Sequence, residues 1–230
     1  MPIFLKNRAE YLSEQMDDPD CDPVKLVNTY RQFKQMNPLI SRWHFIYDRY
    51  LLPCFKTDRT NTMLDIGFGG GDIPLSLSRW AKRDGIDLMI TGIDNDERAV
   101  NYVQSLPHDP KVDFRLDTIE SMTKKNQKFD FVISNHLLHH LDQSGLLAIL
   151  QQTSKLSTRR VLFNDIERGD LAYLGFSLFV GPFLRHSYSR PDGLRSIRRS
   201  YTKPELKAAA PQKWQVSRFF PYRLLLIYDH

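Results

Sequence analysis

Residues 62–74 read Thr-Met-Leu-Asp-Ile-Gly-Phe-Gly-Gly-Gly-Asp-Ile-Pro, and this stretch decides the fold. Its first half, with Met63, Leu64 and Ile66, predicts a short buried strand. Four glycines follow at positions 67, 69, 70 and 71, where missing side chains let a ligand approach the backbone. Asp72 and Pro74 then suit the first turn of a helix, with Asp72 as its cap. This order opens a doubly wound α/β sheet, whose ligand lies at the carboxyl end of the strand.

The residues of the turn restrict the ligand. A dinucleotide fingerprint needs glycine or alanine where Asp72 stands, and a phosphate loop needs a Gly-Lys-Ser/Thr run that this turn lacks. Instead, Asp65 lies two residues before a Gly-x-Gly-x-Gly run, and the turn contains no cationic residue. These features favour a ligand without phosphates.

The stretch Asp65–Gly71 resembles the first motif of class I S-adenosylmethionine-dependent methyltransferases. The resemblance implies S-adenosylmethionine as cofactor. It also implies that Gly67, Gly69 and Gly71 pass beneath the ligand's amino-acid and ribose portions, with Asp65 near the ammonium end. A glycine turn that merely packs helix on strand remains the alternative.

Two further strand ends offer cofactor contacts. The second predicted strand, Leu88–Asp94, ends in Asp94, whose carboxylate can accept hydrogen bonds from both hydroxyls of a ribose, with Asn95 beside the adenine. This feature fits NAD equally well. A third predicted strand ends just before Asp117 and Thr118, where an acid binds the adenine amino group in the family that the chain resembles. Helix capping by Asp94 and loop capping by Asp117 remain open.

The fourth predicted strand leads into Ser-Asn-His-Leu-Leu-His-His-Leu at residues 134–141. This pattern resembles small-molecule methyltransferases, including relatives of the quinone-biosynthesis enzymes. Asn135 and His136 would face the methyl donor or its acceptor, with His136 as the first candidate base and His186 as the second. We expect no metal site, because Leu137 replaces the glutamate of an H-E-x-x-H motif.

The flanking segments complete a single domain. Residues 1–56 carry two amphipathic helical stripes and form either a lid over the ligand or a structural cover; they precede the cofactor-binding core, residues 57–165. Residues 166–202 are a substrate-side insertion that contains the most apolar run, Leu171–Leu184, followed by a run of cations. That run predicts a buried helix or a wall of the acceptor pocket. Residues 203–230 give a closing helix and two strands.

The composition indicates the class of protein and the compartment in which we expect it. The chain has 230 residues, of which 41% are hydrophobic and 26% charged, as in ordinary globular domains. Two cysteines indicate a reducing compartment, and charges soon after the amino terminus argue against a secretory signal, so we expect a cytoplasmic protein. The net charge of +5 is compatible with an acidic acceptor, a membrane surface or RNA.

We therefore expect a Rossmann-like methyltransferase fold with a mostly parallel seven-stranded sheet. The predicted function is methyl transfer to a hydrophobic small molecule, with O-methylation of a phenol, quinol or polyketide-like acceptor favoured. Peripheral membrane contact remains open, as do C-methylation in quinone biosynthesis and a non-catalytic scaffold. An RNA methyltransferase is less favoured, because no appended RNA-binding module or basic-aromatic surface motif is found. A nucleotide-binding oxidoreductase is disfavoured by Asp72.

Overall fold

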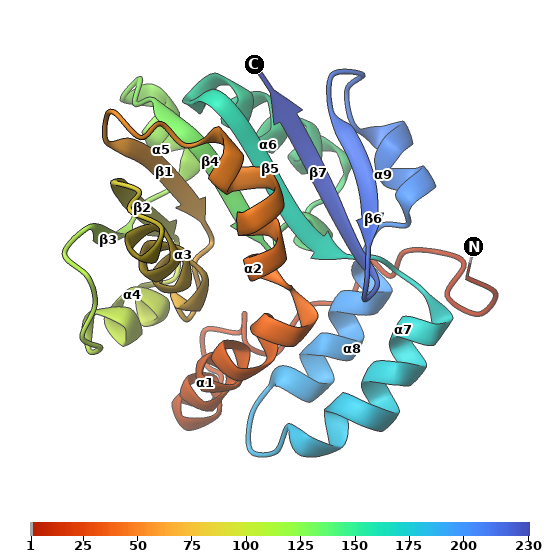
Figure 1. Ribbon diagram of the computed structural model, residues 1–230. Helices are drawn as coiled ribbons and strands as arrows, with labels where there is room; N and C mark the ends of the chain where they lie inside the picture. Colours follow the sequence, from red (N-terminus) through yellow and green to blue (C-terminus); the bar gives the residue numbers. More distant parts are fainter. Residues whose placement is uncertain (1) are drawn as a thin grey trace.

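The computed structural model describes residues 2–230, and its centre is a twisted seven-stranded sheet (Figure 1). The strand order is β3-β2-β1-β4-β5-β7-β6. The first five strands of that order run parallel, whereas β7 pairs antiparallel with both β5 and β6. The strands are β1 (Asn61–Ile66), β2 (Leu88–Asp94), β3 (Val112–Leu116), β4 (Phe129–Asn135), β5 (Ser157–Ile166), β6 (Gln215–Phe219) and β7 (Arg223–Asp229). The expected fold class is confirmed.

Helices cover both faces of the sheet. Alternating strand residues divide the core, so that Met63 and Phe131 face one apolar cluster while their neighbours Leu64 and Val132 face the other. The first cluster is covered by α1 (Pro23–Ile40), α2 (Trp43–Ile46), α3 (Asp72–Arg83) and α4 (Glu97–Gln104). The second is covered by α5 (Ile119–Lys124), α6 (Gln143–Leu156) and α9 (Lys203–Ala209).

The N-terminal region differs from the two expected helical stripes. Asp22 caps α1 by accepting from the backbone N–H groups of Val24 and Lys25. The helix then continues through Leu39, where the sequence pattern starts the second of the two stripes, but Leu39 is 77% exposed here. The second stripe starts afresh at α2 and continues in a π-helical turn (Tyr47–Leu51) and a 3₁₀ turn (Leu52–Cys54).

The region after β5 forms a helical pair. It consists of α7 (Asp170–Gly175), a π-helical turn (Phe176–Val180), a 3₁₀ turn (Gly181–Phe183) and α8 (Ser189–Arg199). In Figure 1, α1, α7 and α8 gather beyond the carboxyl ends of the central strands. The segment before α1 runs along α8, where the Ala9 N–H donates to the Arg198 carbonyl at 3.1 Å. These parts enclose the edge at which a parallel sheet binds its ligand.

Candidate active site

A cavity of about 930 Å³ lies at that edge. Its floor comes from the ends of β1, β2, β4 and β5, and its walls from the segment before α1, from α1, α7 and α8, and from the turn between β6 and β7. This volume lies at the upper end of the range for small-molecule pockets. Apolar side chains from α7 and the turn after it form one wall, which agrees with the predicted pocket wall but not with a fully buried helix.

The glycine turn supplies bare backbone to the cavity. Gly67 and Gly69 line it with φ of 72° and 52°, a left-handed conformation that favours glycine. Gly70 also lines it, and a Cβ there would lie 3.0 Å from the Cβ of Tyr30. Gly71, a predicted cofactor contact, is not part of the wall: a Cβ there would lie 2.8 Å from a methyl of Val103. Its role is therefore helix packing.

Three carboxyl groups surround this end of the cavity. Burial, with the charges of Asp72 and Asp94, raises the pKa of Asp65 well above its ordinary value. Burial likewise raises the pKa of Asp72 to about 6, against the hydrogen bond from Asn37. The predicted cap is wrong, because Asp72 bonds that amide at 2.9 Å while Gly71 occupies the cap position without a side-chain cap. A cation bound beside these acids would lower both pKa values.

Asp94 holds the turn and faces the cavity. One carboxylate oxygen accepts the Gly69 N–H at 2.9 Å and the other accepts the Asp96 N–H at 3.0 Å. Burial raises its pKa, although both N–H groups act in the opposite direction. Each carboxylate oxygen has a second lone pair that a ligand hydroxyl can use. Asn95 also lines the cavity.

Neither Asp117 nor Thr118, the residues predicted to contact the adenine, lines the cavity in this structure. Asp117 forms an ion pair with Lys125 at 2.8 Å, and the hydrogen bond from this ammonium lowers the pKa of Asp117 to about 2. Thr118 caps α5 through the Ser121 N–H. The contacts of Asp117 fit the loop-capping alternative, and its contact with the adenine stays a prediction.

A buried cation, Arg223, lines another part of the cavity, beside His136; this part is called the cationic end. Arg223, at the start of β7, is fully buried and donates to the side chains of Asn164 and Asn135 at 2.9 and 3.1 Å. It also lies 3.2 Å from Nε2 of His136, and Ser41 Oγ lies 3.0 Å from the same nitrogen. Burial lowers the pKa of Arg223 to about 10, so the guanidinium stays charged at neutral pH.

These contacts determine the tautomer and the protonation state of His136. The residue lines the cavity and has a φ of 61°. Arginine only donates, so Nε2 must accept and Nδ1 must carry the proton. Nδ1 has no hydrogen bond among the described residues. Burial, followed by the charge of Arg223, lowers the pKa of His136 well below 6.5. The imidazole is therefore neutral and a weak proton acceptor, with an N–H available for donation.

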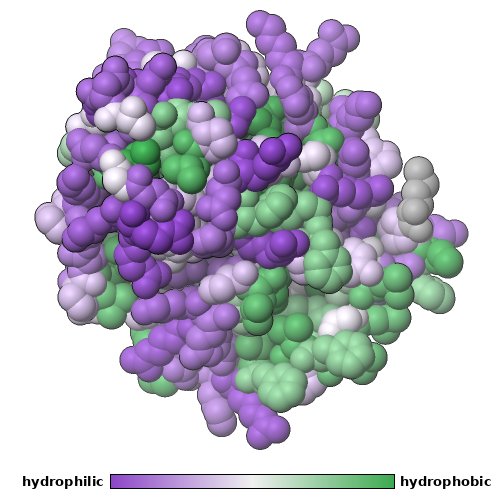
Figure 2. Space-filling view, viewed as in Figure 1, coloured by the Kyte–Doolittle hydropathy of each residue, from purple (hydrophilic) through white to green (hydrophobic). Residues whose placement is uncertain are grey.

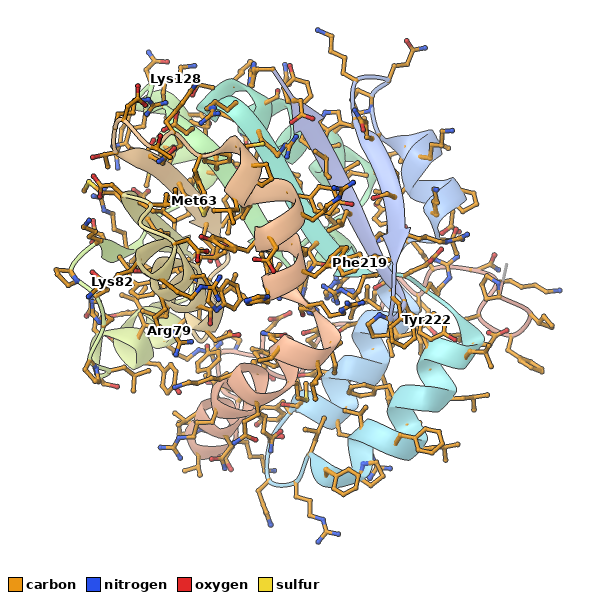
Figure 3. The ribbon with its side chains drawn as sticks, in the orientation of Figure 1. Met63, Arg79, Lys82, Lys128, Phe219 and Tyr222 are labelled. Carbon is orange, nitrogen blue, oxygen red and sulfur yellow. The ribbon has the colours of Figure 1, made fainter. Side chains whose placement is uncertain are left out.

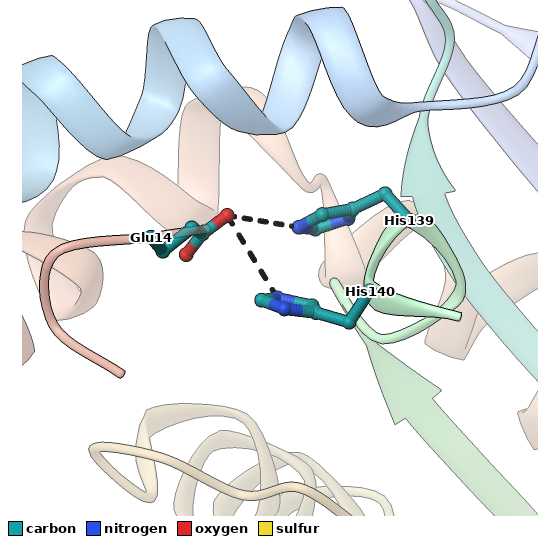
Figure 4. Close-up of side chains that lie close together, drawn as sticks. All are labelled: Glu14, His139 and His140. Carbon is teal, nitrogen blue, oxygen red and sulfur yellow. Dashed lines mark hydrogen bonds and ion pairs between the residues drawn. The ribbon is translucent and has the colours of Figure 1, made fainter. Parts of the chain in front are cut away.

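His139 lies behind this group in a buried chain of charges (Figure 4). Its Nδ1 lies 2.8 Å from Asp165 and its Nε2 lies 3.1 Å from Glu14, on the segment before α1. Burial acts to lower the pKa of His139, but the two carboxylates raise it to about 9. Burial acts to raise the pKa of Glu14, but hydrogen bonding to His139 and the charge of His140 lower it to about 2.

Two groups of side chains here have metal-ligand spacing. Glu14, His139 and His140 offer ligand atoms within 4.8 Å of one another, as do His136, His139 and Asp165. His139 belongs to both groups, and each of its nitrogens already faces a carboxylate. A protonated imidazolium explains that arrangement, since a metal ligand must present a lone pair.

The cations after the apolar run do not enter the cavity. On α8 the side facing it presents Ser189, Asp192, Gly193, Ser196 and Ile197. His186, the second predicted base, is exposed and lies outside the cavity wall.

Sequence reasoning missed Arg223, Glu14 and Asn37. Each lies more than 30 residues from its partner in the chain. Arg223 follows a turn and reads as a solvated strand end, and Glu14 lies in a segment without periodicity. No local signal identifies them, because their partners are chosen by the packing of distant segments.

Comparison with known proteins agrees with this geometry. A model described as "Methyltransferase domain" matches residues 63–159, which agrees with the predicted resemblance to class I methyltransferases. A ubiquinone biosynthesis O-methyltransferase from Bartonella quintana is 24% identical over 143 residues, which cover 58% of this chain and 54% of that protein. The chain thus matches about half the length of its curated relatives.

Solved structures share the fold. The plantazolicin methyltransferase BpumL, in complex with SAH, is 14% identical with a TM-score of 0.61, covering 94% of this chain and 92% of its own. Human N-acetylserotonin methyltransferase, in complex with SAM, is 14% identical with a TM-score of 0.59, covering 90% of this chain and 56% of its own. These likenesses confirm the architecture.

Proposed function

We propose that the chain transfers a methyl group from S-adenosylmethionine to an ionised oxygen of a hydrophobic small molecule, with phenols and quinols as the favoured class. One observation carries this proposal: the same cavity is lined by three acids at the glycine turn and by a buried guanidinium beside His136. The acids Asp65, Asp72 and Asp94 lie at the glycine turn, and the cation Arg223 lies behind His136.

The acidic end fits the proposed cofactor. S-adenosylmethionine carries an ammonium and a sulfonium and no phosphate, and buried acids with raised pKa values are stabilised by such a cation. Bare backbone at Gly67, Gly69 and Gly70 leaves room for close approach. Asp94 would bind the ribose hydroxyls. When bound, the cofactor would supply an electrophilic methyl group on a sulfonium, whose sulfur leaves as a neutral thioether.

The cationic end fits an acceptor that carries negative charge. The Nδ1–H of His136 would donate to the acceptor oxygen, and the charge of Arg223 would favour the ionised form. In the transfer, the oxygen forms a bond to the methyl carbon while the sulfur–carbon bond breaks and its electron pair stays on sulfur. The proton is lost to solvent beforehand. The side chains therefore align and stabilise the reactants, and His136 acts as a donor and not as a base.

A series of phenols with graded pKa values tests this mechanism. We expect the acidic limb of the pH profile of kcat/KM to shift with the pKa of the acceptor, because the acceptor's own ionisation limits the rate. A limb that stays at one pH for all acceptors would instead indicate a protein base. Product analysis by mass spectrometry and NMR distinguishes O- from C-methylation, and transfer to RNA alone would refute the acceptor class.

Two variants separate the roles of His136. His136→Asn keeps an N–H near the Nδ1 position and tolerates the left-handed backbone, whereas His136→Phe removes the donor. We expect His136→Asn to keep most of the turnover and His136→Phe to lose roughly 100-fold, both with cofactor affinity kept. His108→Phe, at an exposed position outside the cavity, is the control. Equal losses in both His136 variants would contradict donation.

A further inference from the structure

A continuous apolar surface covers the outside of the cavity wall. Residues 171–184, a stretch of 14 residues, contain no charged side chain. We define the apolar outer face as the side chains of this stretch that are between 50% and 81% exposed: Leu171, Leu174, Leu178, Phe179 and Phe183. Figure 2 shows apolar residues gathered over α7 and the turns after it. Large side chains concentrated in this way mark an interaction surface.

The stretch is apolar both on the side that faces the cavity and on the side that faces solvent. Ala172, Phe176 and Val180 point inward and line the cavity. Leu174 and Leu178, four residues apart, lie on the other side and are exposed, whereas Leu171 is exposed and also borders the cavity. Burial of the inner side therefore leaves the outer face unexplained by the fold itself.

Two distant segments extend the apolar outer face. The backbone N–H groups of Ile3, Phe4 and Leu5 donate to the carboxylate of Asp170 at the start of α7, and Phe4 is 85% exposed. At the turn between β6 and β7, Phe220 is 76% exposed; its neighbour Tyr222 lines the cavity and lies beside α7 in Figure 3. The surface thus reaches the cavity wall.

Cations without a carboxylate partner border this surface. Arg185 follows Phe183 and is exposed, and the side chain of Arg190 packs against Gly181. Arg42 donates to the carbonyl of Phe220 at 3.0 Å. None of the three forms an ion pair within residues 2–230. The apolar face would contact the acyl layer of an anionic bilayer, and the guanidinium groups at its border, which have no carboxylate partner, would contact the headgroups.

We propose that the apolar outer face docks on the surface of an anionic phospholipid bilayer, with α7 lying parallel to the membrane plane. Among the described residues, no helix has the length and apolar character needed to traverse a bilayer. The inner side of α7 is committed to the cavity, so only the outer face enters the lipid. This docking places the cavity wall against the bilayer, from which an apolar acceptor can be taken up.

Vesicle flotation tests the docking without any acceptor or cofactor, so its outcome is independent of the proposed function. We expect the protein to bind phosphatidylcholine vesicles containing phosphatidylglycerol and to bind pure phosphatidylcholine vesicles more weakly. Leu178→Glu/Phe179→Glu should reduce binding roughly tenfold or more, because two apolar anchors become anions. These residues are 64% and 75% exposed, so the fold should persist.

The matched control is Met89→Glu/Leu116→Glu, which places the same charges at two apolar positions that are each 54% exposed and lie on β2 and β3. Binding by this control at the wild-type level, with loss in the double variant of α7, supports the proposal. Equal binding by both variants, or no binding by the wild type, overturns it. Self-association that the α7 variant alone abolishes, without vesicle binding, would assign the face to a second copy of the chain and also overturn it.

Discussion

Alanine substitutions at Gly69 and Gly71 would separate the two roles of the glycine turn. Both residues have a left-handed φ, of 52° and 72°, so each alanine costs about 1–2 kcal/mol in backbone strain. A Cβ at Gly71 would lie 2.8 Å from a methyl of Val103 and 3.1 Å from the Phe114 ring, which adds about 1–3 kcal/mol of overpacking. A Cβ at Gly69 meets no atom within 4 Å, because the residue borders the cavity.

The expected results are therefore opposite for the two variants. Gly71→Ala should lower the free energy of unfolding by about 2–5 kcal/mol while the folded protein keeps its affinity for S-adenosylmethionine. Gly69→Ala should lower the free energy of unfolding by only about 1–2 kcal/mol. It should weaken the cofactor by roughly tenfold or more, about 1.4 kcal/mol, since the added methyl occupies space where the ligand meets backbone.

Urea denaturation gives the unfolding free energies, and calorimetric titration with S-adenosylmethionine and S-adenosylhomocysteine gives the affinities. Gly85→Ala is the control, because Gly85 has a φ of 70° with no atom within 4 Å and lies outside the cavity wall. If Gly69→Ala binds the cofactor as well as Gly85→Ala does, the turn does not cradle it. If Gly71→Ala is no less stable than Gly85→Ala, the packing argument is refuted.

Two further predictions concern buried charges. Asp94→Asn keeps an acceptor for the Gly69 N–H but loses the charge, so cofactor affinity should fall roughly 10–100-fold by calorimetry; unchanged affinity would exclude a ribose contact. His139→Gln removes the cation that contacts both buried carboxylates, Glu14 and Asp165, and should cost about 3–5 kcal/mol in urea denaturation, with exposed His108→Gln as control. Because folding raises the pKa of His139 from 6.5 to about 9, its stabilisation is full below pH 6.5 and is lost as the pH rises through 9. Glu14, with a pKa lowered from 4.5 to about 2, stabilises fully above pH 4.5 and loses this effect as the pH falls through 2. The stability difference between wild type and His139→Gln should therefore narrow between pH 6.5 and 9, and a constant difference would contradict the charged state of His139.

Much of the cavity lining was predictable from the sequence. Asp65, Gly67, Gly69, Asp94, Asn95, Asn135 and His136 all line the cavity. Each lies at the end of a predicted parallel strand, and such ends meet at one edge of a sheet. Their placement therefore follows from local patterns. That they contact the cofactor stays a prediction.

The differences between expectation and structure also have physical causes. Asp117 and Thr118 have the spacing of a cofactor contact, but Lys125 and the start of α5 lie close enough in the chain to engage them first. Asp72 has the position of a helix cap, yet the distant amide of Asn37 bonds it. In both cases several hydrogen-bond or ion-pair partners were possible for the same side chain. The sequence does not show which of these partners the folded chain brings into contact.

The sequence by itself determined the sheet, the glycine turn and the acidic end of the cavity, because these depend on hydrophobic periodicity and backbone freedom within short segments. Only the tertiary structure decided the cationic end, the enclosed chain from Glu14 through His139 to Asp165, and the exposure of the apolar outer face. Charged side chains that are far apart in the chain meet at these places. Their burial and mutual contacts set the protonation state of each group.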